Sequence, residues 1–201
     1  MTARTSTSPV APPGWLCLLR ALGTAAVGLL LVLPALAQAP EASQIERRVK
    51  AVFLYKFVDY VAWPASTFAQ ADAPVVIGVL GDDRLANELA EVLASRAAGS
   101  RPIGVRRYHE GEPLGGMHML FVAQGETARL AALSKAAAGQ PLLLVSEAEG
   151  ALERGSAINF VLAGGRVKFD IALDAAENHG LKLSSRLLTV ARKIRPAPAP
   201  G

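Results

Sequence analysis

This chain of 201 residues has little of the side-chain chemistry on which enzymes depend. Its single cysteine, Cys17, cannot form an intramolecular disulfide. The histidines His109, His118 and His179 lie in separate segments, which gives no metal-ligand spacing. The chain also lacks a Gly-x-Ser-x-Gly elbow and the Gly-rich loops that bind nucleotide phosphates. We therefore expect no catalytic residue, metal, cofactor or disulfide, and a protein that is not an enzyme.

Long runs of positive charge are absent as well. The basic pairs Arg106-Arg107 and Arg192-Lys193 are short. Of the 21 basic residues only Arg4 and Arg20 precede residue 38, and none of the 17 acidic residues does, so residues 38–201 carry a net charge of only +2. A nearly neutral domain has no electrostatic footprint for a phosphate backbone, so we expect no nucleic-acid partner.

The N-terminus has the order of a secretory signal. Arg4 and Arg20 precede an apolar run over residues 21–33, and Ala35-Leu36-Ala37 follows Pro34. We expect cleavage between Ala37 and Gln38, which makes residues 1–37 a signal peptide. The apolar run is shorter than the ~20 residues that span a bilayer. An uncleaved signal anchor is the alternative.

The first half of the remaining chain alternates helices and strands. Residues 41–63 predict one long helix that ends before Pro64, with Ile45, Val49, Val52 or Phe53, Phe57 and Val61 at helical spacing. Buried strands are predicted over 75–80, 103–108, 117–123 and 141–146, and helices over 83–98 and 126–138. Asp82 or Asp83 is the expected N-cap of the first of these helices. This order predicts a mostly parallel sheet with helical crossovers.

The second half predicts an antiparallel hairpin. Residues 156–163 and 166–173 flank Gly164-Gly165, a good two-residue turn. In that register Leu162 faces Val167, Phe160 faces Phe169 and Ile158 faces Ile171, all on one core face. Because side chains alternate, Asn159 and Asp170 pair on the opposite, more polar face, as do Val161 and Lys168. Asn159 and Asp170 are therefore candidate ligand- or partner-binding residues.

The C-terminal residues predict two short helices and a tail. Asp174 is the expected cap of a helix that ends at Gly180, and Ser184 or Ser185 caps the last helix, whose core residues are Leu187, Ala191 and Ile194. Residues 38–195 thus form one α/β domain, a mixed, mostly parallel sheet flanked by helices with a C-terminal antiparallel hairpin. The Pro/Ala-rich residues 196–201 are an expected disordered tail.

Two further groups of residues are candidates for binding. Lys182, Ser184 and Arg186 lie at a predicted helix start, where free N–H groups attract a small anion or a partner carboxylate. Capping with a surface arginine is the alternative, and Asp170 or Glu177 is a candidate partner of Arg186. The aromatic residues Tyr55, Tyr60 and Trp63 form a possible partner-binding stripe, whereas Phe53 and Phe57 are expected in the core. Trp63 beside Pro64 has an alternative role in closing the helix end.

Two separated segments resemble the YfiR-like family of exported bacterial proteins. Residues 50–64 read KAVFLYKFVDYVAWP, and residues 165–188 read GRVKFDIALDAAENHGLKLSSRLL. The resemblance runs from about Val49 to Ala191. It implies a protein of the Gram-negative periplasm that represses a membrane diguanylate cyclase by binding its periplasmic sensor region. Cyclic-di-GMP output and biofilm formation would follow from that control.

The same resemblance implies one further partner, an outer-membrane lipoprotein that sequesters the repressor, and shows some departures. A histidine kinase in place of the cyclase and a second copy of the chain are further candidate partners. Met117 stands where family members often carry a cysteine, and Ala172 stands where they often carry asparagine. Disulfide-based redox control is therefore not expected. The rival hypothesis is a periplasmic small-molecule binding protein with its pocket at the carboxyl ends of the parallel strands.

Overall fold

A seven-stranded sheet is the frame of the protein. The computed structural model describes residues 33–197 apart from 69, 71 and 96–100, and side chains from residue 41 onward. The strands lie in the order β3-β2-β4-β5-β6-β7-β9, and every neighbouring pair is parallel except β6 and β7. The bounds are β2 (Val75–Leu80), β3 (Ile103–Arg107), β4 (Met119–Val122), β5 (Leu143–Ser146), β6 (Ile158–Ala163), β7 (Arg166–Ala172) and β9 (Lys193–Arg195).

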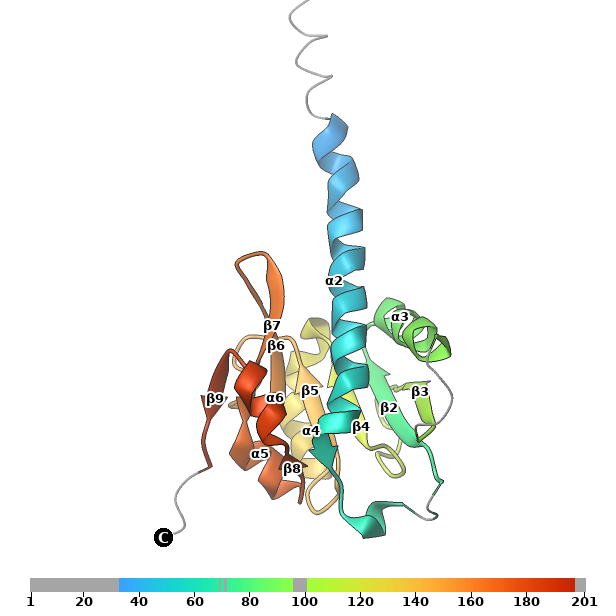
Figure 1. The fold of residues 1–201 in the computed structure, drawn as a ribbon, viewed down its shortest axis with the longest axis vertical. Coiled ribbons are helices and arrows are strands. Elements are labelled where there is room, and N and C mark those ends of the chain that lie inside the picture. The colour runs from blue at the N-terminus through green and yellow to red at the C-terminus, as the bar shows by residue number, and fades with distance from the viewer. Residues whose placement is uncertain (1–32, 69, 71, 96–100, 198–201) are drawn as a thin grey trace, which may run out of the picture. The chain divides into compact units, whose positions relative to one another are not determined.

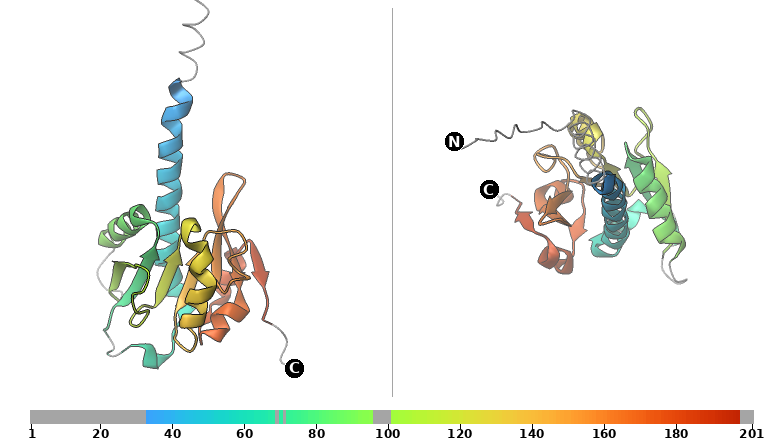
Figure 2. Two further views of the ribbon diagram at one scale, coloured as in Figure 1. Left: turned by 180° about the vertical axis from the view of Figure 1, so that it is seen from behind. Right: turned by 90° about the horizontal axis from the view of Figure 1, so that it is seen from above.

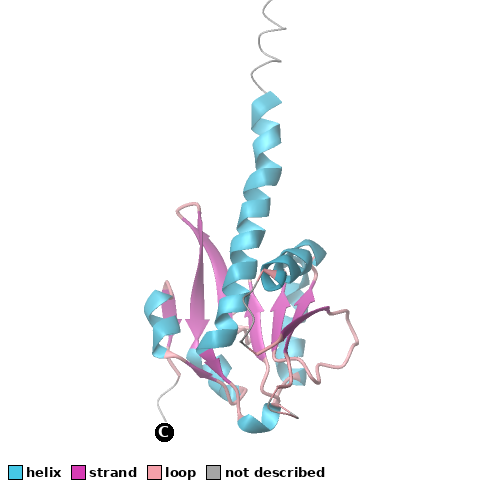
Figure 3. Cartoon of the chain, turned by 45° about the vertical axis from the view of Figure 1, so that its right-hand side comes forward, coloured by secondary structure: helices cyan, strands magenta, loops and turns pink. Residues whose placement is uncertain are grey.

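Helices cover the two faces of this sheet (Figure 1). Their bounds are α2 (Leu33–Tyr60), η1 (Ala65–Thr67), α3 (Asp83–Ala94), η2 (Gln124–Arg129), α4 (Leu130–Ala136), α5 (Leu173–Asn178) and α6 (Ser185–Val190). A separate two-stranded sheet joins β1 (Val61–Ala62) to β8 (Lys182–Leu183). The mixed, mostly parallel α/β fold with its antiparallel hairpin confirms the predicted fold class (Figure 3).

Side-chain alternation along the strands gives the sheet two apolar layers. One cluster includes Leu54 and Phe57 of α2, Leu85 and Leu89 of α3, and Phe160 of β6. A second, smaller cluster includes Leu130 of α4, and α4 lies on the other face of the sheet (Figure 2). The second cluster contains no residue of β6, β7 or β9.

The aromatic side chains explain how α2 is held. Phe57 stacks on Phe160 with ring centroids 5.8 Å apart and meets the edge of Phe169 at 5.1 Å. Phe53 contacts both strand aromatics as well. The expected core placement of Phe53 and Phe57 is therefore confirmed, with Phe57 fully buried and Phe53 partly exposed.

The apolar face assigned to the first helix was wrong in part. Ile45, Val49 and Val52 are 66%, 37% and 40% exposed. The core-facing residues Ala51 and Leu54 lie on a different side of α2 from these three. Residues three or four positions apart share a face of a helix, whereas Ala51 is only two positions from Val49 and Leu54 only two from Val52. The helix also ends at Tyr60 rather than Trp63, because Val61 pairs with Leu183 in the small sheet.

The hairpin register was predicted correctly, pair by pair, including Asn159 with Asp170 and Val161 with Lys168. Leu162 is nevertheless 64% exposed, because it lies near the hairpin tip beyond the packed aromatics. The helix predicted over 126–138 is split into η2 and α4. The helix predicted to reach residue 98 ends at Ala94, and residues 96–100 lie outside the described part of the chain.

Two predictions near the C-terminus were wrong. Asp174 caps no helix: the N-cap of α5 is Ala172, and the Asp174 carboxylate accepts hydrogen bonds from Arg195. The last helix ends at Val190, and Ile194 lies in β9 with 39% exposure rather than in the core. Ser184 does cap α6, as expected, by accepting a hydrogen bond from the N–H of Leu187.

Residues 44–201 form one compact unit that holds both sheets. The expected signal peptide lies largely outside the described residues, which begin at residue 33, and so does most of the expected tail. The predicted cleavage position, Ala37–Gln38, falls within the bounds of α2. Within the described ranges, no helix is both long and apolar enough to cross a membrane.

Candidate functional site

The polar face of the β6–β7 hairpin brings two predicted site residues together. Asn159 and Asp170 are cross-strand neighbours and are each 6% exposed. Each alternates with a core phenylalanine, so the packing of Phe160 and Phe169 against α2 forces the two polar side chains to the opposite face. A buried amide and a buried carboxylate thus share one side of the sheet.

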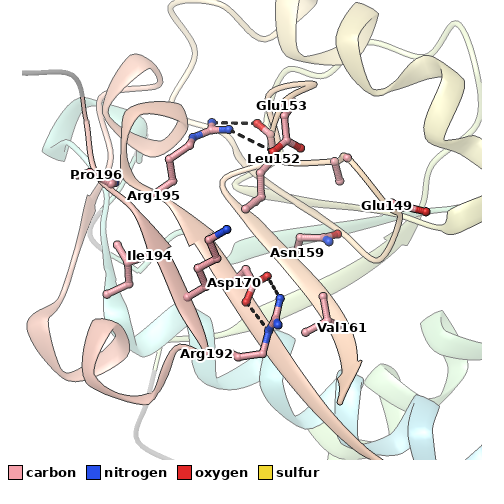
Figure 4. A pocket seen from close by; sticks show the side chains of 13 residues that line it. Glu149, Leu152, Glu153, Asn159, Val161, Asp170, Arg192, Ile194, Arg195 and Pro196 are labelled. Carbon is pink, nitrogen blue, oxygen red and sulfur yellow. Dashed lines mark hydrogen bonds and ion pairs between the residues drawn. The ribbon is translucent and has the colours of Figure 1, made fainter. Parts of the chain in front are cut away.

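A cavity of about 410 Å³ lies on this face (Figure 4). It is bounded by β6, β7 and β9 and by the loop that follows β5. The residues around it are Glu149, Gly150, Ala151, Leu152, Glu153, Asn159, Val161, Asp170, Arg192, Lys193, Ile194, Arg195 and Pro196. Its volume is within the range of about 300–1,000 Å³ found for small-molecule sites.

Arg192 closes one side of the cavity by pairing with Asp170. Its Nε donates to Asp170 Oδ1 at 2.8 Å, and its Nη2 donates to Oδ2, so the pairing is bidentate. The backbone N–H of Arg192 donates to Phe169 O at 2.9 Å, which fixes the base of the side chain beside β7. These hydrogen bonds raise the pKa of the Arg192 guanidinium. Asp170 was a candidate partner of Arg186; that pairing was wrong.

Arg195 braces the opposite end of the cavity. Its Nη2 lies 2.9 Å from the carbonyl oxygen of Leu152 and 3.1 Å from both carboxylate oxygens of Asp174. Glu153 lies 3.9 Å from Nη1. Arg195 therefore ties β9 to α5 and to the loop after β5, and its charge is already matched by these acids.

One polar atom beside the cavity has no partner among the described residues. Asn159 Oδ1 is buried and accepts no hydrogen bond from any described residue. Buried side-chain oxygens are almost always hydrogen-bonded, to protein or to water, because the unpaired state costs free energy. The cavity is thus lined by a paired carboxylate, by further charged side chains and by apolar residues, and the unpartnered oxygen is buried behind its surface.

The other predicted residues gather on the opposite side of the sheet. Lys182 is exposed on β8 and pairs with Ala62, while the N–H of Ser184 donates to Tyr60 O at 2.9 Å. Arg186 is exposed in the first turn of α6 and makes no hydrogen bond or ion pair with the described residues. β1, β8 and α6 therefore bring together Tyr60, Lys182, Ser184 and Arg186. Asn159 and Asp170 lie on the other side of the sheet.

Tyr55 and Trp63 are partly buried against the first core cluster. The Lys56 ammonium lies 4.8 Å from the centre of the Tyr55 ring. Trp63 Nε1 donates to His118 O at 3.3 Å and its ring meets the edge of the His118 ring. Trp63 is thereby placed at the start of β4, at the end of the sheet where the parallel strands begin.

The carboxyl ends of the parallel strands, where the rival hypothesis placed a pocket, carry a more open hollow of about 510 Å³. Two of its acids are paired there, because Arg129 lies 2.7 Å from Glu110 and 2.8 Å from Glu126. No group of three or more metal-binding side chains occurs within the described ranges. This hollow has no unpartnered buried atom comparable to Asn159 Oδ1.

Sequence reasoning missed Arg192 and Arg195 as members of the cavity. Both depend on β9, which was interpreted as part of the last helix because Leu187, Ala191 and Ile194 have a helix-like spacing. The alternation of Lys193, Ile194 and Arg195 before Pro196 was the available signal for a short edge strand.

A family model described as YfiR/HmsC-like matches residues 47–192. The chain belongs to the YfiR/HmsC-like family. This confirms the resemblance inferred from the two terminal segments. The YfiR/HmsC-like region contains Asn159, Asp170 and Arg192, whereas Lys193 and Arg195 lie just beyond it. No curated protein matches the chain.

Proposed function

We propose that this YfiR/HmsC-like protein is an exported regulator that binds the periplasmic sensor region of a membrane diguanylate cyclase and represses it. The observation that carries the proposal is the family match over residues 47–192. Fold alone does not define function, so the proposal also rests on which surface can bind a partner.

The surface we assign to the partner is the α2–α6 face, defined here as Ile45, Val49, Val52, Arg186 and Val190. The first three are spaced four and three residues apart on α2, and Val190 on α6 is 67% exposed. Both helices lie on the same side of the sheet (Figure 1). Exposed apolar side chains at helical spacing are typical of a helix that docks against a partner groove.

The charge of this face indicates what it binds. Arg186 and nearby Lys182 are exposed and make no ion pairs with the described residues. An apolar sensor surface with acidic residues at its edge would be complementary to it. Three further predicted residues lie beneath this face. The N–H of Ser184 donates to Tyr60 O, and Trp63 Nε1 donates to His118 O at the start of β4.

Repression follows from differential binding. The protein must bind the inactive sensor more tightly than the active one, because a ligand with equal affinity for both states does not change the equilibrium between them. Moving the population from 1:99 to 99:1 takes about 10⁴-fold tighter binding to the inactive state, or about 5.5 kcal/mol.

A pull-down from solubilised membranes tests the partner surface. The purified protein is expected to enrich one membrane protein with a periplasmic sensor region, and Val52→Glu is expected to weaken that capture at least about tenfold by placing a charge in an apolar contact. The matched control is Ala131→Glu, an exposed position on α4 at the other face of the sheet. Equal capture by both variants would refute the α2–α6 face.

A further inference from the structure

His179, directly after α5, has one ring nitrogen bound and the other free. The residue is 7% exposed. Its Nδ1 lies 3.1 Å from Ala137 O and 3.3 Å from Gln140 O, and because carbonyl oxygens only accept, Nδ1 carries the proton and donates. In the neutral ring Nε2 is then an acceptor. Nε2 has no hydrogen-bond partner among the described residues, and it is not sealed beneath the surface as Asn159 Oδ1 is, so a donor can reach it.

A cavity of about 210 Å³ adjoins this ring. His179 lines it, whereas Ala137 and Gln140 do not, so the bound Nδ1 faces away from the cavity and Nε2 is the nitrogen left to face it. The cavity is smaller than the roughly 300–1,000 Å³ of sites for drug-sized ligands, so it suits a ligand of only a few heavy atoms.

The hydroxyl of Ser134 on α4 is a second free acceptor in this cavity. Ser134 Oγ makes no hydrogen bond with the described residues, and it too is not sealed beneath the surface. It lies against the backbone of Gly155: a Cβ added to that glycine would be 2.2 Å from Ser134 Oγ. The absence of a side chain at Gly155 therefore leaves room for the hydroxyl at the wall of the cavity.

The charged side chains around the cavity leave an excess of one negative charge. Two acids, Glu153 and Asp174, line it with a single base, Arg195. Arg195 directs Nε and Nη2 to Asp174 and Nη2 also to Leu152 O. Its Nη1 is 3.9 Å from Glu153, whose side chain is 70% exposed, so the Glu153 carboxylate keeps lone pairs for another donor. The cavity therefore attracts a cation and disfavours an anion.

We propose that this cavity binds the protonated amino group of a small primary amine. An ammonium group has three N–H donors and no acceptor, which matches the three free acceptors, His179 Nε2, Ser134 Oγ and the Glu153 carboxylate. A quaternary ammonium has the charge without the donors, and a carboxylate has the wrong charge. The site shares no residue with the α2–α6 face, so this proposal does not depend on the regulatory function.

The test is a titration of the nitrogen-15-labelled protein at constant pH and ionic strength, with propylammonium, tetramethylammonium and propionate as separate probes. Long-range proton–nitrogen NMR spectra report each histidine ring nitrogen. We expect propylammonium to shift His179 Nε2 saturably in the millimolar range and to leave His109 and His118, which do not line the cavity, unmoved. Tetramethylammonium and propionate should leave all three unmoved. No saturable shift of His179 with propylammonium, or an equal shift with tetramethylammonium, would overturn the assignment.

Two variants locate the contacts. Ser134→Ala is expected to weaken propylammonium binding about fivefold without lowering the melting temperature, because Ser134 Oγ makes no hydrogen bond in the free protein. Glu153→Gln should weaken it about threefold, since this acid is largely exposed to solvent. The matched control is Glu149→Gln, an exposed acid on the same loop that does not line the cavity, and it should change nothing.

Propylammonium binding that both Ser134→Ala and Glu153→Gln leave as tight as in the wild type would also overturn the assignment, because the ligand would then lie elsewhere. No membrane partner is present in these assays, so their failure leaves the regulatory proposal standing. Failure of the membrane pull-down would in turn leave the amine site untouched.

Discussion

Lys50 is the best example of a single side chain that holds the domain together. Its side chain is 12% exposed, and its ammonium bridges Glu46 of α2 and Glu147 after β5. Burial by itself lowers the pKa of Lys50, but hydrogen bonds to Glu147 and Glu46 raise it above its ordinary value. Glu147 also accepts a hydrogen bond from the N–H of Gln124, so one cluster links α2, β5 and η2.

Removing this ammonium should destabilise the protein. Lys50→Met leaves two carboxylates facing each other without a cation, and we expect a loss of about 1–3 kcal/mol in the free energy of unfolding at neutral pH. Urea denaturation measures it. Lys56→Met, at an exposed position six residues further along α2, is the control and should change little. Equal losses in the two variants would contradict the role of the cluster.

The same cluster predicts an alkaline limit to stability. A lysine whose folded pKa is raised contributes stability that is present below the unfolded pKa of about 10.5 and is lost as pH rises through the folded pKa. The wild type should therefore lose stability more steeply than Lys50→Met above about pH 10.5. Parallel curves of unfolding free energy against pH would show that Lys50 is not preferentially protonated in the folded state.

Protonation of His118 should limit the stability of the fold at acid pH. Its Nδ1 accepts the N–H of Val76 at 3.1 Å, and burial together with the charge of Arg101 lowers its pKa below the ordinary 6.5. The unfolded chain therefore takes up a proton before the folded one, and stability falls as pH drops below about 6.5, by at most about 1.4 kcal/mol per pH unit.

The measurement is unfolding free energy between neutral pH and pH 5 for wild type, His118→Gln and His109→Gln. The first variant should have a flatter profile than the wild type. His109 pairs with Glu112 at an exposed position, with 72% of its side chain accessible, so solvent weakens the pair and its replacement should change the profile much less than His118→Gln does. A His118→Gln profile as steep as that of the wild type would assign the acid dependence to the carboxylates instead.

Single residues also show what sequence reasoning could reach. Asn159 and Asp170 were placed on one face from strand alternation alone, because the Gly164-Gly165 turn fixed the register. Their partner Arg192 could not be identified, since nothing local to it predicts contact with a residue 22 positions away. Asn159 Oδ1 could be recognised as vacant only once its surroundings were known.

At the scale of elements, the hairpin turn offers a clean test. Gly164 and Gly165 have φ of 61° and 68°, and an added Cβ would meet no atom within 4 Å at either, so any cost of substitution is conformational. Gly164→Val should destabilise the hairpin by about 1–2 kcal/mol, whereas Gly164→Asn, which tolerates this conformation, should cost much less.

Hydrogen exchange at the tips of β6 and β7 measures this effect, because the tip can open without global unfolding. Faster exchange is expected for Gly164→Val alone. If Gly164→Asn accelerated exchange as much as Gly164→Val, the strained backbone would not be the cause, and the turn would have to be explained by lost flexibility or altered contacts.

Elements with local signals were predicted well, and elements made by distant pairing were not. β2, β4 and β5 are continuous apolar segments that are buried throughout or nearly so, and a single apolar run is enough to indicate them. β1 and β8 are two residues each and exist because Val61 and Leu183 pair across more than a hundred positions. β9 depends in the same way on β7.

At the scale of the whole molecule, the sheet separates two candidate binding surfaces. The α2–α6 face is apolar and basic, whereas the cavity beside Asn159 is small and is lined by charges of both signs, among them the Asp170–Arg192 pair. Both are attached to the hairpin: α2 packs on Phe160 and Phe169, and the cavity floor is formed by the residues adjacent to them, Asn159 and Asp170.

The most direct test is to measure cyclic-di-GMP production by spheroplasts of the source bacterium lacking its own copy of this protein, with and without added purified protein. We predict that wild type and Ala131→Glu lower production, and that Val52→Glu fails to do so while retaining its fold by circular dichroism. Production that is unchanged or raised by the wild-type protein would contradict repression of a membrane diguanylate cyclase.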